Sequence, residues 1–249
     1  MKKATRKTPD AHFREQICQI GHRIWLRGMC AGNEGNHSIR LPGNKILCTP
    51  SQVSKGFMNP QDLAICDMAG NQLSGPRKRT SEINLHLAIY KSRADVGAVV
   101  HGHPPHATAY CITGVELPHS IHPEAEVFLG HVQTVPYVTP GDQRLGDSVI
   151  PYLQDPATNC LLLGQHGVVT FAPTLEQAYY TFEVLESYAK ILILANQIKS
   201  PKRFSQSEVA ELEALRARFG FPISAKPRSS STVKRQTPNK QQPATKPHR

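Results

Sequence analysis

Hydrophobic and polar positions alternate along the chain between a helical period and a strand period. Segment 11–29 has apolar side chains three or four residues apart, which is the spacing of one helix face. These side chains are Phe13, Ile17, Ile20, Ile24 and Leu26. Two short runs, 37–41 and 45–49, flank Pro42-Gly43-Asn44, and this arrangement predicts a β-hairpin.

The same patterns predict the other elements of the fold. Helices are expected at 81–92, 104–112, 142–153, 174–196 and 205–218, the last one ended by Gly220. Strands are expected at 63–67, 97–100, 133–137, 160–163 and 168–171. The alternation of the two kinds of element predicts one α/β domain with mixed strand pairing.

The net charge of +10 is concentrated at the two ends of the chain. Residues 222–249 contain seven Lys or Arg and no Asp or Glu, and residues 1–7 contain four, which leaves −1 for residues 8–221. A nucleic-acid-binding domain carries its positive charge on the folded surface, so no specific nucleic-acid partner is expected. We expect a basic N-terminal segment (1–10), a domain (11–221) and a disordered basic tail (222–249) rich in Ser, Pro, Gln and Lys.

Cysteine usage and hydropathy bear on the compartment. None of the six cysteines stands in a CxxC motif, which is typical of free thiols in a reducing compartment. No apolar run approaches the roughly 20 residues that span a bilayer, and no apolar segment follows the basic N-terminus as in a secretory signal. The sequence therefore predicts a cytoplasmic protein without a membrane partner.

Three histidines carry the clearest chemical signal. His101 and His103 end an apolar strand, where residues two apart point the same way, so their imidazoles form a pair of potential metal ligands. His166 lies in a Gly-Gln-His-Gly turn between two strands and would complete a three-histidine site with an open fourth position, as in catalytic zinc sites. The alternative is that these are solvent-facing strand histidines and a turn histidine without a ligand.

Glu82 and one glycine-containing loop are further candidates. Glu82 follows Thr80 and Ser81 at the start of a predicted helix, where it either takes part in acid–base chemistry or only complements the helix dipole. The loop 31–38 has two glycines with asparagine and could turn its N–H groups toward a phosphate. It is neither a P-loop nor a dinucleotide-binding GxGxxG motif, so an ordinary turn before the hairpin is the alternative.

Five motifs, in this order, resemble those of the class II aldolase/adducin family, and most of all its L-fuculose-1-phosphate aldolases. They are Gly35-Asn36-x-Ser38, Cys48-Thr-Pro-Ser51, Thr80-Ser81-Glu82, His101-x-His103 and Gln165-His166-Gly167. The resemblance covers roughly Phe13 to Phe219. It implies a single three-layer αβα domain with a mixed, mostly antiparallel central sheet, assembled as a homotetramer.

The resemblance also implies roles for particular residues. It implies zinc bound by His101, His103 and His166, with Glu82 as the catalytic acid–base group. The residues that match the family's phosphate pocket are Gly35, Asn36, Ser51, Gln52, Thr80 and Ser81. The implied reaction is cleavage of a phosphorylated ketose to dihydroxyacetone phosphate and an aldehyde. The alternative is a pentulose-phosphate 4-epimerase or a dehydratase on the same scaffold.

Two stretches depart from the aldolase pattern. The chain has Ser51-Gln52 where the aldolases have Thr-Gly. Segment 120–130 lacks the tyrosine that the aldolases contribute to a neighbouring subunit. His122, Glu126 and Tyr137 are candidates for an acid or base that reaches a neighbour's site, and His122 and Glu126 are the preferred pair.

Overall fold

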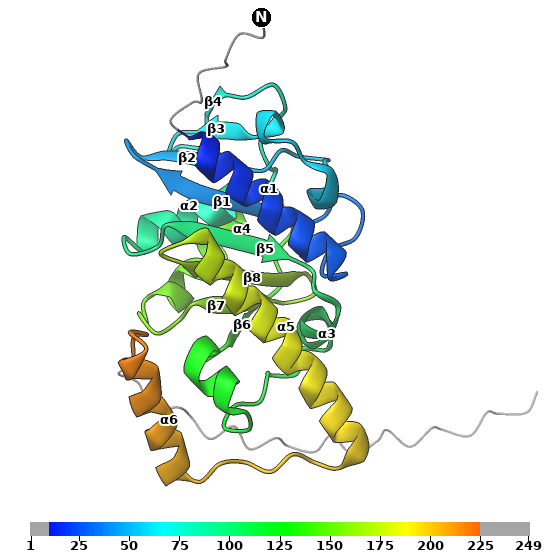
Figure 1. Ribbon diagram of the computed structural model, residues 1–249, viewed down its shortest axis with the longest axis vertical. Coiled ribbons are helices and arrows are strands. Elements are labelled where there is room, and N and C mark those ends of the chain that lie inside the picture. The colour runs from blue at the N-terminus through cyan, green and yellow to red at the C-terminus, as the bar shows by residue number, and fades with distance from the viewer. Residues whose placement is uncertain (1–9, 225–249) are drawn as a thin grey trace, which may run out of the picture.

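The computed structural model describes residues 10–224, which are built around one sheet of eight strands (Figure 1). The strands are β1 (Asn36–Leu41), β2 (Lys45–Cys48), β3 (Ala64–Cys66), β4 (Gln72–Ser74), β5 (Ala98–Gly102), β6 (Gln133–Val135), β7 (Cys160–Leu163) and β8 (Gly167–Ala172). Their order across the sheet is β4-β3-β2-β1-β5-β8-β7-β6. Neighbouring strands run antiparallel, except for the parallel pair β6 and β7.

Helices cover both faces of this sheet (Figure 1). One face carries α1 (Ala11–Leu26), α3 (Pro105–Thr113) and α5 (Leu175–Ile198), and the other carries α2 (Ile83–Ser92) and α4 (Gln143–Val149). Side chains of each strand alternate between the two layers. On β5, Ala98 and Val100 join the core under α5, whereas Val99 joins the core under α2. The predicted three-layer αβα architecture with a mixed, mostly antiparallel sheet is confirmed.

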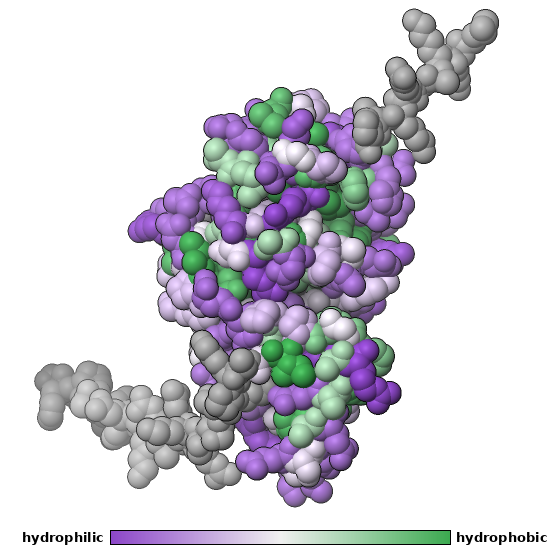
Figure 2. Space-filling model, turned by 90° about the vertical axis from the view of Figure 1, so that its left-hand side faces the viewer, coloured by the Kyte–Doolittle hydropathy of each residue, from purple (hydrophilic) through white to green (hydrophobic). Residues whose placement is uncertain are grey.

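The remaining elements lie at the margins of these layers. Helix α6 (Gln206–Arg218) packs against a π-helical turn at Ala125–Leu129, and shorter 3₁₀ turns occupy Lys55–Phe57, Pro60–Asp62 and Ile150–Leu153. Polar side chains cover most of the face shown in Figure 2, where apolar residues form small separate groups. Among the described helices, none is both long and apolar enough to cross a membrane.

Several predicted boundaries differ from the structure for local reasons. The first helix ends at Leu26 rather than at residue 29, because Gly28 takes a φ of +66°. The predicted helix 142–153 is α-helical only to Val149 and then tightens into a 3₁₀ turn containing Pro151, which has no N–H to donate. Strand β4 was not predicted, because all three of its residues are exposed and no alternation of apolar and polar side chains marks it.

The folded part of the chain extends beyond the predicted boundary at residue 221. Arg216 Nε donates to the Pro222 carbonyl at 2.8 Å, and Ser224 Oγ donates to Asp155 Oδ2 at 2.5 Å. Residues 222–224 therefore belong to the folded part rather than to the predicted tail. Segments 1–9 and 225–249, on which the rest of the two terminal predictions falls, lie outside the described residues.

Arg216 anchors this C-terminal segment, and its replacement tests the anchor. Arg216 is 2% exposed, and its guanidinium also donates to the Val127 carbonyl at 2.7 Å and the Ala157 carbonyl at 3.1 Å. We expect Arg216→Met to lower the free energy of unfolding by about 3 kcal/mol, because hydrogen bonds from charged groups contribute roughly 1.5–3 kcal/mol each. Thermal unfolding checks this, with the exposed Arg218→Met as a control that changes stability by less than about 0.5 kcal/mol. Equal melting temperatures for the two variants would contradict the anchoring role.

Candidate active site

Strand pairing brings the predicted site residues to one edge of the sheet. Because β5 is antiparallel to both β1 and β8, the end of β5 lies beside the first residues of β1 and β8. Asn36 pairs with His101, and Gly102 pairs with Val168, two residues after His166. Segments distant in sequence thus meet at the end of the central strand.

The three predicted histidines form one cluster. One potential ligand nitrogen from each of His101, His103 and His166 lies within 4.8 Å of the others. The Nδ1 atom of His101 is 2.8 Å from the Val168 carbonyl, and that of His103 is 2.8 Å from Glu34 Oε2. These acceptors hold the proton on Nδ1 and leave both Nε2 lone pairs buried without a hydrogen-bond partner.

The donor set fits a divalent metal ion. Three neutral imidazoles are ligands that zinc and related ions prefer, and second-shell acceptors on Nδ1 fix ring orientation at such sites. Burial lowers the pKa of His166 to about 3, with the neighbouring charge of His101 acting in the same direction. Burial and the charge of His101 also lower the pKa of His103. Neutral rings at His103 and His166 are ready to bind a metal without first losing a proton. Burial opposes the charge on His101, but the Glu82 carboxylate raises the pKa of that ring, so metal binding there would release a proton.

Glu82 lies beside this cluster at the start of α2. Its Oε2 atom is 3.3 Å from His101 Nε2, and its Oε1 atom is 3.3 Å from His166 Nε2. Burial by itself raises the pKa of the Glu82 carboxyl, but the charges of His101 and His166 and a hydrogen bond from Asn36 hold that pKa well below its usual range. The carboxylate makes no capping hydrogen bond to α2, and its contacts are instead with the Asn36 amide and with two histidines of the cluster.

The predicted anion-binding segments are also adjacent at this edge. Ser51 N–H donates to the Lys78 carbonyl at 2.8 Å, and Thr80 N–H donates to the Thr49 carbonyl at 3.0 Å, which places the loop at 51–52 beside 80–81. Gly35 has a φ of +76°, and a Cβ there would lie 3.0 Å from the His101 carbonyl oxygen. Glycine therefore permits the close approach of this loop to β5.

Asn36 differs from the other predicted phosphate-binding residues. Its side-chain Nδ2 donates to Glu82 Oε2 at 2.7 Å, and its Oδ1 is 2.5 Å from His86 Nε2. Both ends of the amide are thus engaged within the protein. The main-chain N–H groups of the loop, together with Ser51, Gln52, Thr80 and Ser81, remain the predicted phosphate donors.

Sequence reasoning missed two groups that touch this site. Glu34 accepts a hydrogen bond from His103 and orients its ring. A carboxylate inside the glycine-containing loop could have been identified from the sequence as a candidate site residue. His86 lies one helical turn after Glu82, and residues four apart share a helix face, so its proximity was predictable. Val168 contributes only its backbone carbonyl to His101, and side-chain identity carries no signal for such a contact.

The residues predicted to reach a neighbouring subunit lie elsewhere in this chain. Glu126 is 2% exposed, and its carboxylate accepts from Ser120 N–H at 2.5 Å. His122 contacts the Tyr188 ring, and its Nδ1 is 3.3 Å from a Glu124 carboxylate oxygen. Tyr137 is 53% exposed. Their role in a neighbour's site stays a prediction.

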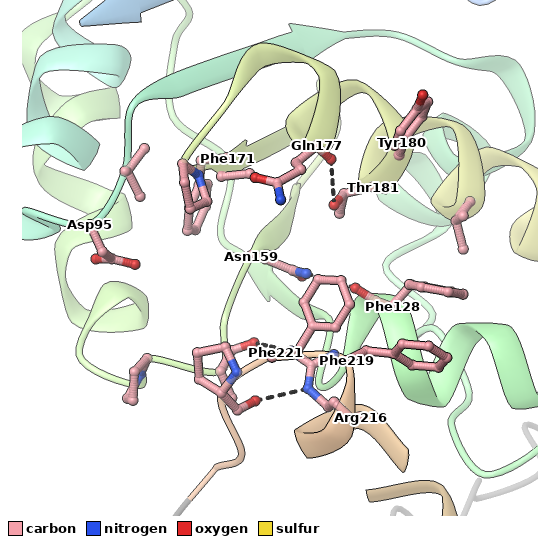
Figure 3. A pocket seen from close by; sticks show the side chains of 18 of the residues that line it. Asp95, Phe128, Asn159, Phe171, Gln177, Tyr180, Thr181, Arg216, Phe219 and Phe221 are labelled. Atoms are coloured by element: carbon pink, nitrogen blue, oxygen red, sulfur yellow. Dashed lines mark hydrogen bonds between the residues drawn. The ribbon is translucent and has the colours of Figure 1, made fainter.

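A cavity of about 600 Å³ lies at the opposite edge of the sheet (Figure 3). Val96, just before β5, and Pro173, just after β8, line it, whereas the histidines lie at the other ends of these strands. Phe219 and Phe221 gather there beside Arg216, as Figure 3 shows. None of the predicted site residues lines this cavity. The predicted chemistry therefore belongs to the histidine edge, which has the features of a metalloenzyme site.

Comparison with known proteins identifies the family. The class II aldolase and adducin N-terminal domain matches residues 15–193. The L-fuculose phosphate aldolase of Methanococcus maripaludis is 35% identical over 184 residues, which are 74% of this chain and 96% of that protein. The 3-oxo-tetronate 4-phosphate decarboxylase of Escherichia coli (strain K12) is 32% identical over 210 residues, which are 82% of this chain and 97% of that protein. A solved L-fuculose 1-phosphate aldolase superposes with a TM-score of 0.77 at 25% identity, over 85% of this chain and 97% of the other.

The chain therefore belongs to the class II aldolase family. The enzymes of this family are lyases, and they typically use a divalent metal ion. The resemblance stated from the five motifs is confirmed.

Proposed function

We propose that this protein is a zinc-dependent class II aldolase that cleaves a phosphorylated ketose to dihydroxyacetone phosphate and an aldehyde. The observation that carries the proposal is the Glu82 carboxylate, whose oxygens lie 3.3 Å from two of the three clustered imidazoles. The name of the Methanococcus relative makes L-fuculose 1-phosphate the first substrate to test.

The chemistry divides between the histidine cluster and Glu82. A divalent ion held by His101, His103 and His166 would act as a Lewis acid toward the negative charge that carbon–carbon cleavage leaves on the substrate. Glu82 transfers the proton at the dihydroxyacetone phosphate carbon that takes part in the cleaved carbon–carbon bond. In the condensation direction its carboxylate takes this proton from dihydroxyacetone phosphate, and in cleavage the same group returns a proton to the enediolate.

The three loops supply orientation. Gly35, Ser51, Gln52, Thr80 and Ser81 would hold the phosphate through N–H and hydroxyl groups, next to the carbon that reacts. Binding energy gained at the phosphate is then used to align the distant reacting bond with Glu82.

Decarboxylation of 3-oxo-tetronate 4-phosphate is a second candidate, favoured by the longer match to the E. coli decarboxylase, over 210 residues against 184. Loss of CO₂ from this β-keto acid breaks a carbon–carbon bond beside a ketone and leaves the enediolate of dihydroxyacetone phosphate. Protonation of that enediolate gives the same product as aldol cleavage. The two reactions differ only in what leaves, so Glu82 and the histidines would have the same tasks in both.

Product analysis tests the proposal. Zinc-loaded protein is incubated separately with L-fuculose 1-phosphate and 3-oxo-tetronate 4-phosphate, and dihydroxyacetone phosphate is measured with a coupled NADH assay. Aldolase activity yields an aldehyde in equal amount, decarboxylase activity yields CO₂, and the predicted 4-epimerase or dehydratase alternative yields neither cleavage product from a pentulose phosphate. Absence of dihydroxyacetone phosphate from both substrates would reject the proposal. Metal analysis of the purified protein tests whether the bound metal ion is zinc.

We also propose a homotetramer whose active sites lie at subunit boundaries. In the described part of the chain, the carboxylates beside the three histidines are Glu82, which has the proton-transfer role above, and Glu34, which is bonded to His103. A group from a neighbouring subunit would then handle the hydroxyl proton on the aldehyde side. Mixing inactive Glu82→Gln chains with His122→Ala or Glu126→Ala chains is expected to restore turnover. Because Glu126 is buried in its own chain, the half-exposed His122 gives the cleaner test. An active monomer in light scattering, or an unimpaired His122→Ala enzyme, would contradict the shared site.

A cytoplasmic location and the absence of a specific nucleic-acid partner stay predictions. The six cysteines are all unpaired, which supports a reducing compartment. Cell fractionation tests the first of these, and binding assays across salt concentrations test the second.

A further inference from the structure

A buried chain of hydrogen bonds leads away from Glu82 into the core. Asn36 Nδ2 is 2.7 Å from Glu82 Oε2, and Asn36 Oδ1 is 2.5 Å from His86 Nε2. His86 Nδ1 is 2.6 Å from Ser38 Oγ, which is 2.8 Å from the Tyr90 hydroxyl. Every member of the chain is 8% exposed or less, and His86 is fully buried.

The direction of each hydrogen bond follows from the Asn36 amide. Its NH₂ group donates to Glu82 Oε2, and its oxygen, which can only accept, faces His86. His86 therefore carries its proton on Nε2, and its bare Nδ1 accepts from Ser38. The Ser38 oxygen is then left to accept from Tyr90. Burial lowers the pKa of His86 to about 3, which agrees with a neutral ring that has one donor and one acceptor.

The chain also makes the two oxygens of Glu82 unequal. Oε2 accepts from Asn36, whereas Oε1 is buried without a hydrogen-bond partner and faces His166. A carboxylate free to rotate would exchange these positions, and the Asn36 amide opposes that exchange because its own orientation is set by His86.

We infer that His86 is a positioning residue that acts through Asn36 to hold Glu82 with Oε2 anchored and Oε1 free to exchange the proton. This inference rests on the proposed role of Glu82 in proton transfer. Strand β1 supplies Asn36 and Ser38 from one face, and α2 supplies Glu82, His86 and Tyr90 from successive turns. The pairing of this helix with this strand is thus what orients the base.

Three variants separate positioning from a simple packing role. His86→Leu removes both hydrogen bonds, and we expect kcat to fall about 10–100-fold with KM within about threefold, because small misplacements of a reacting group cost rate rather than binding. His86→Gln retains an NH₂ group for Asn36 and an oxygen for Ser38, and we expect it to recover kcat to within about fivefold of wild type. Tyr90→Phe removes only the last donor and is expected to change kcat by less than about threefold.

A double-mutant cycle assigns the effect to Glu82. If His86 acts through Glu82, then His86→Leu has no further effect on kcat in a Glu82→Gln background, whereas independent effects would multiply. A Glu82→Gln enzyme with normal turnover would reject the proposed function itself. Loss of activity in Glu82→Gln together with normal kcat in His86→Leu would reject only the positioning role.

Crystal structures give a readout that does not depend on activity. In His86→Leu we expect the Asn36 amide and the Glu82 carboxylate to leave the positions seen here, while His86→Gln keeps both. Unchanged positions in His86→Leu would overturn the inference. Metal content is expected to stay at the wild-type level in both variants, because neither nitrogen of His86 contacts the three-histidine cluster.

Discussion

Replacement of Glu82 by Gln is expected to lower turnover by about 10²–10⁴-fold, which is the usual contribution of general acid–base catalysis. The amide oxygen of Gln still accepts from Asn36, so the fold and the hydrogen bond at Oε2 are preserved. What is lost is a group that takes and returns a proton beside the histidines. Steady-state kinetics with dihydroxyacetone phosphate as the measured product gives the size of the effect.

A matched control and a melting curve make this result specific. Glu116→Gln makes the same chemical change at an exposed loop position and is expected to leave turnover unchanged. If Glu82 only complemented the dipole of α2, the variant would lose about 0.3–1 kcal/mol of stability and keep its rate. That combination would show that the carboxylate takes no part in the reaction.

Replacement of His166 by Ala is expected to weaken metal binding by more than about 100-fold and to abolish turnover. Removal of even a second-shell partner of a metal ligand typically costs 10–100-fold in affinity, and His166 is one of only three donors in the cluster. Competition against a fluorescent zinc chelator measures the affinity, and elemental analysis after gel filtration measures retained metal.

The exposed His12, on helix α1, provides the control for this experiment. His12→Ala removes an imidazole far from the sheet edge and is expected to bind metal as tightly as wild type. Equal affinity of His166→Ala and wild type would mean that the metal, if one binds, is held by a different set of side chains. The three-histidine assignment would then be wrong.

Local sequence determined the elements that bury one continuous face. Helices α1 and α5 have long apolar stripes, and the hairpin of β1 and β2 has its turn residues at Pro42-Gly43-Asn44, so each could be predicted from neighbours along the chain. Strand β4 has no buried face, and its pairing with β3 depends on the rest of the sheet. The local hydrophobic pattern therefore did not predict β4, because a strand with no buried face needs no regular spacing of apolar residues.

The candidate site shows the same division. The spacing of two residues at a strand end predicts that His101 and His103 are metal ligands, and the position of His166 between glycines predicts a third. The sequence by itself therefore predicted three potential metal ligands. Only the antiparallel pairing of β5 with β8 brings His166 to the other two, because pairing register is a property of the whole sheet.

The environment of Glu82 was decided by tertiary structure alone. Sequence reasoning left this residue between a helix-dipole role and an acid–base role, since both require a carboxylate in the first turn. Packing of α2 against β1 and β5 turns the carboxylate toward His101 and His166 and places the Asn36 amide behind it. Residue types and spacings are written in the sequence, but which atoms share a buried, low-dielectric pocket depends on how distant segments fold onto one sheet edge.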